Sequence, residues 1–576
     1  MHVSAPRARL VAAALSCVVF AAPTVSHAQL AAPSQLTPQN LRPDPSARNQ
    51  GIVLPGTSAA AVPAGAANLS VLIDQVQVDG AFAELAPETE AWLREIRGRR
   101  ISVADLYADA AALERIYTEA GYPLVRVTLP PQQLVDHGRL VVRVVDGFIE
   151  AIDISGLPER VLEVVTARTE AILRRGHVTL VEIERALLIA GDVSGLKLKS
   201  TLMRGSREGG VRLLLEGEHL LVTGSLGADD RLSKSLGIWQ LRGSVALNSA
   251  FGAGEQIYAT MGLGADITAA TQGSSPLAVY GGGVVLPIGV DGITVNPEYT
   301  HSTTRTQQSP GVPASLGSFD RFALRLRDPL ILTRKTSLYL NFSLEAVTQQ
   351  VTAPAFGVTL NSDRYVVLRA GPDSTLTLPW GDGLQLGANL SQGLGGRTAT
   401  DAATSNIPLS RLGAGPDFTK LTVNTRLSQP LPGELRLDLI GAGQDSFGQP
   451  MLRSEQIALD GSDAVSAFAA GSFTADQGVT ARGELVRPFP VSINATGATV
   501  SPYLFGSLGR GWLLDATSVE QSVINASAFG VGIRGNVDAK DGLPAASLAI
   551  ELARGYTDVP GLRQGWRINV NASAVF

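Results

Sequence analysis

The sequence predicts a multidomain protein with two small α+β domains followed by a transmembrane antiparallel β-barrel of about 16 strands. Three observations lead to this prediction. Two blocks within residues 69–217 repeat one order of predicted elements, β-α-α-β-β. From about residue 218, helical signals give way to alternating strands separated by turn residues. The chain then ends on such a strand, in which Ile568, Val570 and Phe576 share one face.

The N-terminus has the three parts of a secretory signal peptide, which we place at residues 1–28. Arg7 and Arg9 precede an apolar run, and Ser26-His27-Ala28 offers a small-x-small cleavage site. The apolar run is too short to span a bilayer as a helix. Because Cys17 is the only cysteine, the mature protein would have no thiol, no disulfide and no thiolate metal site.

Composition limits the structure of the next segment and the classes of ligand. Residues 29–68 are rich in Pro, Ala, Ser and Gln without hydrophobic periodicity, so we expect a flexible linker. The six histidines are scattered and form no pair at helical spacing, so we expect no metal site. The net charge of −5 arises from interspersed acids and bases, and without a basic stripe nucleic acid is not an expected partner.

The first α+β block, residues 69–147, begins with a strand predicted by the alternation of residues 71–80. Residues 87–98 and 103–122 carry helix start and stop signals. Two more strands follow them. The second block, residues 148–217, repeats this order, which indicates an internal duplication.

The remaining region, residues 218–576, is predicted to form barrel strands that are hydrophobic toward lipid and polar toward a wet lumen. Within residues 337–345, Phe342 and Leu344 fall on one face and Glu345 falls on the other. A basic residue facing lipid at mid-depth costs roughly 2–4 kcal/mol, so the charged faces must point inward.

The two α+β blocks resemble polypeptide-transport-associated (POTRA) domains, which dock extended clients along strand edges. GYPLVRVTLPPQQL and GRLVVRVVDGFIEAIDISG resemble the first such domain of two-partner secretion transporters, and ERALLIAGDVSGLKLKSTLMRGSREGGVRLLLE resembles the second. In the barrel, residues 224–262 and 441–461 are similar to the first hairpin and the loop-6 entry strand of the haemolysin secretion/activation family (ShlB/FhaC/HecB). On texture alone, the blocks are equally compatible with two α/β domains of another use.

This resemblance implies an outer-membrane translocase that captures an unfolded exported protein in the periplasm and secretes it through its barrel. The implied partners are a large, β-helical secreted passenger, outer-membrane lipid, the barrel assembly machinery and periplasmic chaperones. Clients are expected at the strand edges 123–129 and 196–203, which include Val125, Val127 and Leu198. Phe576 is expected to be the signal that the assembly machinery reads.

Two signature motifs of this family are degenerate here. Its loop-6 tip, V-R-G-(Y/F), is matched by Val465, Ser466, Ala467 and Phe468. Its barrel-wall motif, F-x-D-x-G, is matched by Phe505, Ser507 and Gly509. The arginine and the aspartate, which pair in the family, are therefore both serine. Losing both charges is far less costly than leaving one unpaired in a confined lumen. We expect the two hydroxyls to face each other and to bond more weakly than ions.

The sequence does not predict an enzyme or a cofactor. It has no Gly-Lys dipeptide and hence no P-loop, Gly262-x-Gly264 lacks the third glycine of a dinucleotide fingerprint, and no G-x-S-x-G elbow occurs. Three alternative functions stay open: a factor that inserts other barrels into the membrane, a porin-like channel with periplasmic binding domains, and a transporter that has lost its activity.

Overall fold

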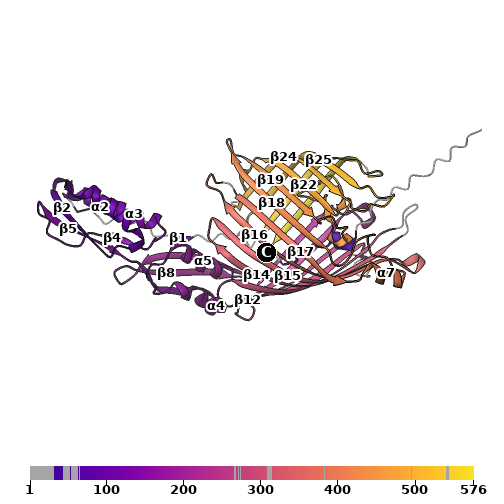
Figure 1. Ribbon diagram of the computed structural model, residues 1–576, viewed down its shortest axis with the longest axis horizontal. Coiled ribbons are helices and arrows are strands. Elements are labelled where there is room, and N and C mark those ends of the chain that lie inside the picture. The colour runs from indigo at the N-terminus through magenta and orange to yellow at the C-terminus, as the bar shows by residue number, and fades with distance from the viewer. Residues whose placement is uncertain are drawn as a thin grey trace, which may run out of the picture.

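The computed structural model describes residues 32–42, 52–53, 62–63, 65–264, 268–269, 272, 274–307, 314–381, 383–493, 496–539, 544–562 and 564–576. Two α/β domains form an arm, residues 65–219, that extends from one end of a closed β-barrel (Figure 1). This architecture confirms the predicted fold class. The predicted signal peptide, residues 1–28, lies outside the described residues. Within the described ranges, the helices lack the length and hydropathy needed to cross a membrane.

The first domain is a four-stranded sheet in the order β3-β2-β5-β4 that packs against two helices. Its elements are β2 (Ser70–Asp79), α2 (Ala86–Ile96), β3 (Arg99–Ser102), α3 (Val103–Glu119), β4 (Arg126–Thr128) and β5 (Gly138–Val145). Ser102 starts α3 because its side chain accepts a hydrogen bond from the backbone N–H of Asp105. Leu113, Tyr117 and Val142 are fully buried between the helices and the sheet.

The second domain repeats this arrangement, and its sheet has the order β1-β7-β8-β6. Its elements are β6 (Phe148–Gly156), α4 (Glu159–Thr169), α5 (Leu180–Gly191), β7 (Leu196–Arg204) and β8 (Gly210–His219). Strand β1 (Ile52–Val53) comes from the region expected to be a linker, and it pairs in parallel with β7, with Ile52 opposite Ser200. An earlier part of the same chain therefore covers Ser200 and Thr201 on the outer edge of β7.

The barrel is closed by sixteen antiparallel strands, one of which is divided into β22 and β23. The first eight strands are β9 (Val222–Asp229), β10 (Gln240–Asn248), β11 (Gln256–Gly264), β12 (Leu277–Ile288), β13 (Ile293–Arg305), β14 (Leu316–Leu332), β15 (Thr336–Ala353) and β16 (Val358–Thr377). The others are β17 (Gly383–Gly396), β18 (Thr419–Leu431), β19 (Leu435–Asp445), β22 (Gln477–Val486) with β23 (Phe489–Ile493), β24 (Thr496–Trp512), β25 (Val523–Val537), β26 (Ala545–Thr557) and β27 (Gly565–Val575).

The two faces of the barrel strands differ as predicted. Phe342 and Leu344 of β15 are 40% and 44% exposed on the outside, whereas Glu345 is buried toward the lumen. Strands β14, β15 and β16 have 17, 18 and 20 residues. Since about 9–11 residues cross a membrane, this wall extends beyond the bilayer on the side of α7 (Ala399–Ser405) (Figure 1).

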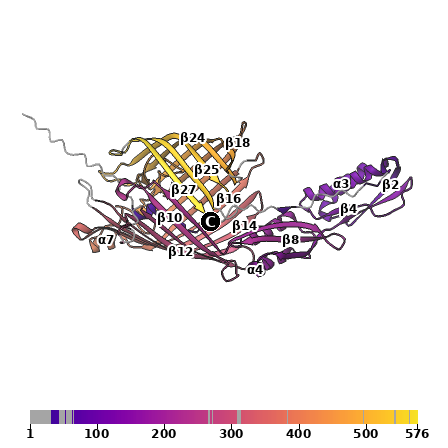
Figure 2. The same ribbon diagram turned by 180° about the vertical axis from the view of Figure 1, so that it is seen from behind.

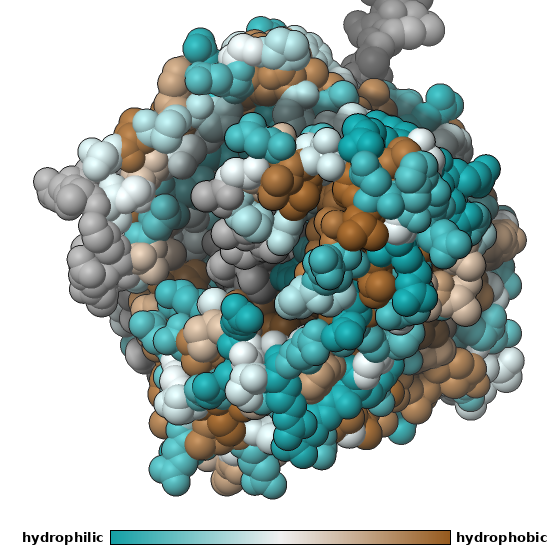
Figure 3. Space-filling view, turned by 90° about the vertical axis from the view of Figure 1, so that its left-hand side faces the viewer, coloured by the Kyte–Doolittle hydropathy of each residue, from teal (hydrophilic) through white to brown (hydrophobic). Residues whose placement is uncertain are grey.

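The barrel closes where β27 pairs with β9, on the side seen in Figure 2. This pairing is short and runs only from Asn571 opposite Asp229 to Val575 opposite Ser225. Figure 3 looks along the long axis from the end of the arm and shows hydrophilic and hydrophobic residues mixed around a hollow beside the arm.

Two segments pack inside the barrel. Loop 6, residues 446–476, folds inward between β19 and β22 and contains the short strands β20 (Ile457–Ala458) and β21 (Thr474–Ala475). Residues 32–42, which include α1 (Pro33–Leu36), lie against β13 and β14. The expectation of a flexible linker is therefore wrong for residues 32–42, because barrel residues far along the chain bind them.

The second domain docks directly on the barrel. Leu188 and Ile189 of α5 form a buried hydrophobic cluster with Leu332 and Tyr339. Arg185 donates a 2.7 Å hydrogen bond from Nη1 to the carbonyl of Pro329. Helix α5 thus rests on the turn between β14 and β15, and this contact sets the direction of the arm.

Candidate functional site

The tip of loop 6 lies on the lumen wall formed by β22 to β26. Val465, Ala467 and Phe468 pack in one hydrophobic cluster with Phe505 of β24. Glycines on the wall make room for this contact. A Cβ on Gly555 would lie 2.8 Å from both Ala467 Cβ and the Phe468 ring, and one on Gly509 would lie 3.3 Å from Val465 Cγ2. The residues of the two degenerate motifs are thus brought together, apart from their serines.

The two serines have other partners, so the expectation that they face each other is wrong. Ser466 donates a hydrogen bond to Glu551 of β26 and accepts one of 2.9 Å from Arg482 Nη1. Ser507 donates to the carbonyl of Ala528 over 3.4 Å. The physical reason is that an arginine and a glutamate of the wall are stronger partners for a hydroxyl than another hydroxyl is.

Arg482 of β22 is the centre of a buried ionic network. Its side chain is 0% exposed. It lies 2.5 Å from Glu551 and 2.7 Å from Glu484, and its guanidinium carbon is 3.9 Å from the centroid of the Phe505 ring. Arg534 of β25 binds Glu484 through two hydrogen bonds of 2.6 and 2.8 Å. Two arginines thus neutralise two glutamates in the wall.

This network lies beside the serines of both degenerate motifs. Arg482 stands directly opposite Ser507 in the pairing of β22 with β24. An arginine thus lies next to both serine positions, on the wall and not on the loop tip, and the Ser466 hydroxyl accepts a hydrogen bond from it. Sequence reasoning missed Arg482, Glu484 and Glu551. The spacing of Arg482 and Glu484 does place both on one strand face, but the register that puts Arg482 beside Ser507 requires the fold.

The base of loop 6 is fixed by two more buried carboxylates. Asp476 lies 2.6 Å from Arg411 and accepts hydrogen bonds from the backbone N–H groups of Leu514 and Met451. Glu455 lies 2.7 Å from Arg369 and 2.8 Å from Lys420. Although burial raises the pKa of Glu455, these two cations hold it well below its ordinary value. Loop 6 is therefore anchored by charge at its last residue, Asp476, and at Glu455 within its first half.

Asp460 links the two arms of loop 6 on either side of its tip. Its carboxylate accepts hydrogen bonds from the N–H groups of Gly471 (3.0 Å) and Phe473 (2.8 Å). Burial raises the pKa of Asp460 to about 6, against the opposing effect of these hydrogen bonds and of Arg567. Loop 6 thus contains one carboxyl group that titrates near neutral pH.

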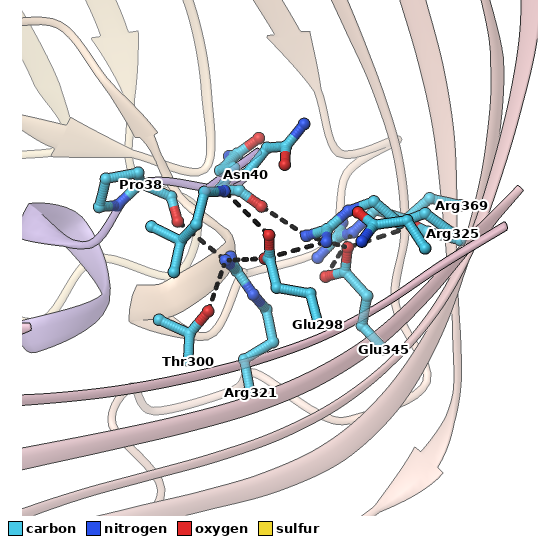
Figure 4. Close-up of polar contacts among 12 residues, drawn as sticks. Pro38, Asn40, Glu298, Thr300, Arg321, Arg325, Glu345 and Arg369 are labelled. Carbon is cyan, nitrogen blue, oxygen red and sulfur yellow. Dashed lines mark hydrogen bonds and ion pairs between the residues drawn. The ribbon is translucent and has the colours of Figure 1, made fainter. Parts of the chain in front are cut away.

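The opposite wall of the lumen holds residues 32–42 (Figure 4). Arg321 Nη2 donates to the carbonyl of Pro38 over 2.8 Å, and Arg325 Nη2 donates to that of Gln39 over 2.7 Å. The N–H of Leu41 donates to Glu298 Oε2 over 3.0 Å. Charged side chains of β13 and β14 therefore hold the backbone of this segment.

The predicted client-binding positions lie in two different environments. Val125 and Val127 are core residues of the first domain, and the backbone N–H of Val127 already donates to the Glu114 carboxylate. Leu198 is buried in the second domain, on the strand whose edge pairs with β1. At the β4 edge the Val127 donor is thus already bound, and at the β7 edge β1 covers Ser200 and Thr201.

Phe576 lies at the seam of the barrel. Its backbone N–H and carbonyl bond to Gly224 of β9 over 2.9 and 2.8 Å. A Cβ on Gly224 would lie 2.7 Å from the Phe576 ring, so a larger residue there would require the ring to move. Among the described residues, no three His, Cys, Asp or Glu side chains are placed to hold a metal ion.

Comparisons with known families match both parts of this architecture. The family model described as haemolysin secretion/activation protein ShlB/FhaC/HecB matches residues 212–535. The model of the ShlB-type POTRA domain matches residues 71–147.

Two curated relatives are outer membrane transporters called CdiB. The chain is 26% identical to that of Dickeya dadantii (strain 3937) over 386 residues, which are 64% of this chain and 64% of the relative. It is 26% identical to that of Escherichia coli over 233 residues, which are 40% and 37% of the two chains. The matched region thus spans less than two thirds of either relative.

Two solved structures share the fold. CdiB from Escherichia coli superposes with a TM-score of 0.67 at 20% identity and covers 94% of this chain and 95% of its own. CdiB from Acinetobacter baumannii gives a TM-score of 0.58 at 15% identity and covers 88% and 90%.

Proposed function

Because this chain belongs to the haemolysin secretion/activation protein family, whose model matches more than half of it, we propose that it is a two-partner secretion transporter. It is an outer-membrane β-barrel with POTRA domains on its periplasmic side. In this proposal, the arm captures an unfolded exported protein and the barrel conducts it to the cell surface.

One observation carries the proposal beyond family membership. The second domain is fixed to the barrel through α5, so a client bound on the arm is held next to the barrel mouth. A pocket at this end of the barrel is lined by Leu188 of α5 and by polar barrel residues such as Asp373, Gln385 and Asn424, and we take it as the mouth. A polar entrance suits an extended chain with unpaired backbone groups.

The proposed partners follow from this role. They are a large β-helical passenger, periplasmic chaperones that keep it unfolded, lipid around the barrel, and the assembly machinery that inserts it. Clients would pair with the edge of β7 after β1 leaves it, since a parallel or antiparallel strand added there gains main-chain hydrogen bonds.

The test compares the proteins secreted by cells with and without this chain. Loss of the chain should remove one large protein from the medium, and the full chain should restore it. A variant without residues 69–147 should not restore it, although its barrel keeps its heat-modifiable migration. A general fall in other barrel proteins would instead support an assembly factor, and unchanged secretion would support a channel.

The β7 edge is tested with Ile52→Pro, which removes a backbone donor from β1. Hydrogen exchange around Ser200 and Thr201 should become faster, because these are the β7 residues that β1 covers. Val62→Pro, at an exposed position outside any strand, is the control. Equal exchange in the two variants would count against β1 as the cover of this edge.

A further inference from the structure

Three charged residues on the lumen wall bind the backbone of residues 38–41 and none of its side chains. Glu298, Arg321 and Arg325 contact one N–H group and two carbonyl groups of this stretch (Figure 4). Hydrogen bonds to charged groups are about twice as strong as those between neutral groups. Because every residue except proline offers the same N–H and carbonyl groups, such contacts do not depend on sequence.

Other contacts of the segment are specific to its side chains. Leu41 fills a hydrophobic pocket with Ala246, Tyr258 and Val285, and a Cβ on Gly281 would lie 2.1 Å from Leu41 Cδ1. The wall thus has two kinds of contact. The leucine pocket fits this segment, whereas the charged cluster fits any extended chain.

The charged cluster has the properties of a site that can be vacated and refilled. Glu298 lies 3.4 Å from Arg321 and 2.9 Å from Arg325, so both arginines keep a counter-charge when the segment leaves. Arg321 is only 5% exposed, and its Nε has no hydrogen-bond partner among the described residues. A cavity of about 420 Å³ lies beside the segment and is lined by both arginines. The site therefore has an unused donor and adjoining space.

We propose that Glu298, Arg321 and Arg325 form a binding site for the backbone of an extended polypeptide in transit, with residues 38–41 as its resting occupant. This inference rests on the proposed transport function. A site that does not depend on sequence suits a protein channel, because many different residues of the exported chain pass the same place in turn. As the exported chain moves, its successive N–H and carbonyl groups would form and break hydrogen bonds with these three side chains.

The test uses the purified full-length chain in planar lipid bilayers. All variants carry Leu41→Ala, which weakens the anchor of the resting segment equally and should raise conductance. The probe is an uncharged, unfolded peptide of Ser, Asn, Gly and Thr, and a second probe is the same peptide with methylated backbone nitrogens. Arg325→Gln should shorten blocks by the parent peptide about tenfold, as expected for one charge-assisted hydrogen bond.

Two variants and one probe make the result specific. Arg426→Gln is the matched control, since Arg426 pairs with Asp463 of loop 6 and should leave block durations unchanged. Arg325→Lys keeps a charged donor, so its block durations should lie between those of the parent and those of Arg325→Gln. If Arg325→Gln loses heat-modifiable migration, Arg325→Lys is compared with the parent in its place. The methylated probe cannot donate to Glu298 but keeps the carbonyls that Arg321 and Arg325 bind. Its blocks should therefore be shorter than those of the parent peptide, and Arg325→Gln should shorten them further.

Two results would overturn the site: equal block durations for Arg325→Gln and Arg426→Gln, or blocks by the methylated probe that are as long as those by the parent peptide. A Leu41→Ala channel that the parent peptide never blocks would overturn the proposed conduction of polypeptides as well. The failure of the site alone is thus distinguished from the failure of the transport function.

Discussion

At the scale of single residues, Arg482 connects the loop-6 tip to the barrel wall. We predict that Arg482→Gln lowers the free energy of unfolding by about 3–5 kcal/mol, because it leaves Glu551 buried without its ionic partner. Arg482→Gln combined with Glu551→Gln should recover much of this loss. A double-mutant cycle on barrel unfolding in detergent measures the coupling, and a value within about 0.5 kcal/mol of zero would contradict the network.

The same geometry makes a prediction about returning the arginine to the loop. Ser466→Arg alone should destabilise loop 6, because a second guanidinium would meet Arg482 in the same buried space. Ser466→Arg with Arg482→Ser restores one arginine opposite Glu551 and should be tolerated. Protease cleavage of loop 6 is the measurement. Equal cleavage in the single and the double variant would show that the two positions are not interchangeable.

Asp460 predicts a pH dependence of loop 6. Its pKa is raised from 3.8 to about 6, so the folded loop binds the proton more tightly than the unfolded chain does. Its contribution to stability is therefore present below about pH 4 and is lost as the pH rises to about 6, by at most about 3 kcal/mol. Loop 6 should resist protease better at pH 5 than at pH 7.5.

The variant Asp460→Asn should remove this difference between pH 5 and pH 7.5. Asp463→Asn is the matched control, because Asp463 lies in the same loop but its side chain is 63% exposed. A pH dependence that survives Asp460→Asn would assign the titration to another group.

At the scale of elements, the seam where the last strand, β27, pairs with the first barrel strand, β9, is held by few residue pairs. The C-terminal Phe576 is one of the residues that hold it. We predict that deletion of Phe576 and the substitution Gly224→Val both impair barrel assembly. The deletion removes two backbone hydrogen bonds, and the valine would collide with the Phe576 ring. Heat-modifiable migration and surface protease protection are the measurements.

Gly243→Ala on β10 is the control for the seam, since its Cβ would have an ordinary contact of 3.4 Å with Leu226. Normal assembly of Gly224→Val would show that the ring can move away. Normal assembly without Phe576 would contradict its role as the assembly signal, which at present is a prediction from the sequence.

At the scale of the whole molecule, the arm is built as a continuous unit with the barrel. Leu124 of the first domain is buried in the core cluster of the second, and the N–H of Leu180 donates to the carbonyl of Gly121 over 2.9 Å. The ring of His177 stacks on Phe82 with centroids 4.0 Å apart. These contacts hold the first domain on the second, and the docking of α5 holds the second domain on the barrel. The position of the first domain is therefore fixed relative to the barrel mouth.

We predict that Ile189→Ser loosens the arm without melting the barrel, because Ile189 is buried against Leu332 and Tyr339. Spin labels on the arm and the barrel should give a broader distance distribution, and secretion should fall. Cys17 is the only cysteine in the sequence, so labels can be placed on introduced cysteines in a Cys17→Ser background. Val181→Ser, at a position 57% exposed on the same helix, is the control. An unchanged distribution would mean that other contacts fix the arm.

The sequence by itself determined the architecture of this protein. The alternation in strands such as β15 and β27 predicted which face meets lipid, because charged groups such as Glu345 cannot face hydrocarbon. The spacing of helix caps and strands predicted both α/β domains. These features are local, because a hydrophobic period of 2 or 3.6 residues can be recognised within a short stretch of sequence.

Only the tertiary structure decided the contacts that make the lumen. The segment 32–42 has no hydrophobic period, and its order comes from Glu298 and Arg321, more than 250 residues away. The partner of Ser466 is Arg482 because the register of β22 and β24 brings that arginine under the loop tip. Such pairings depend on how distant strands align in the closed barrel, and no local pattern of residues specifies that alignment.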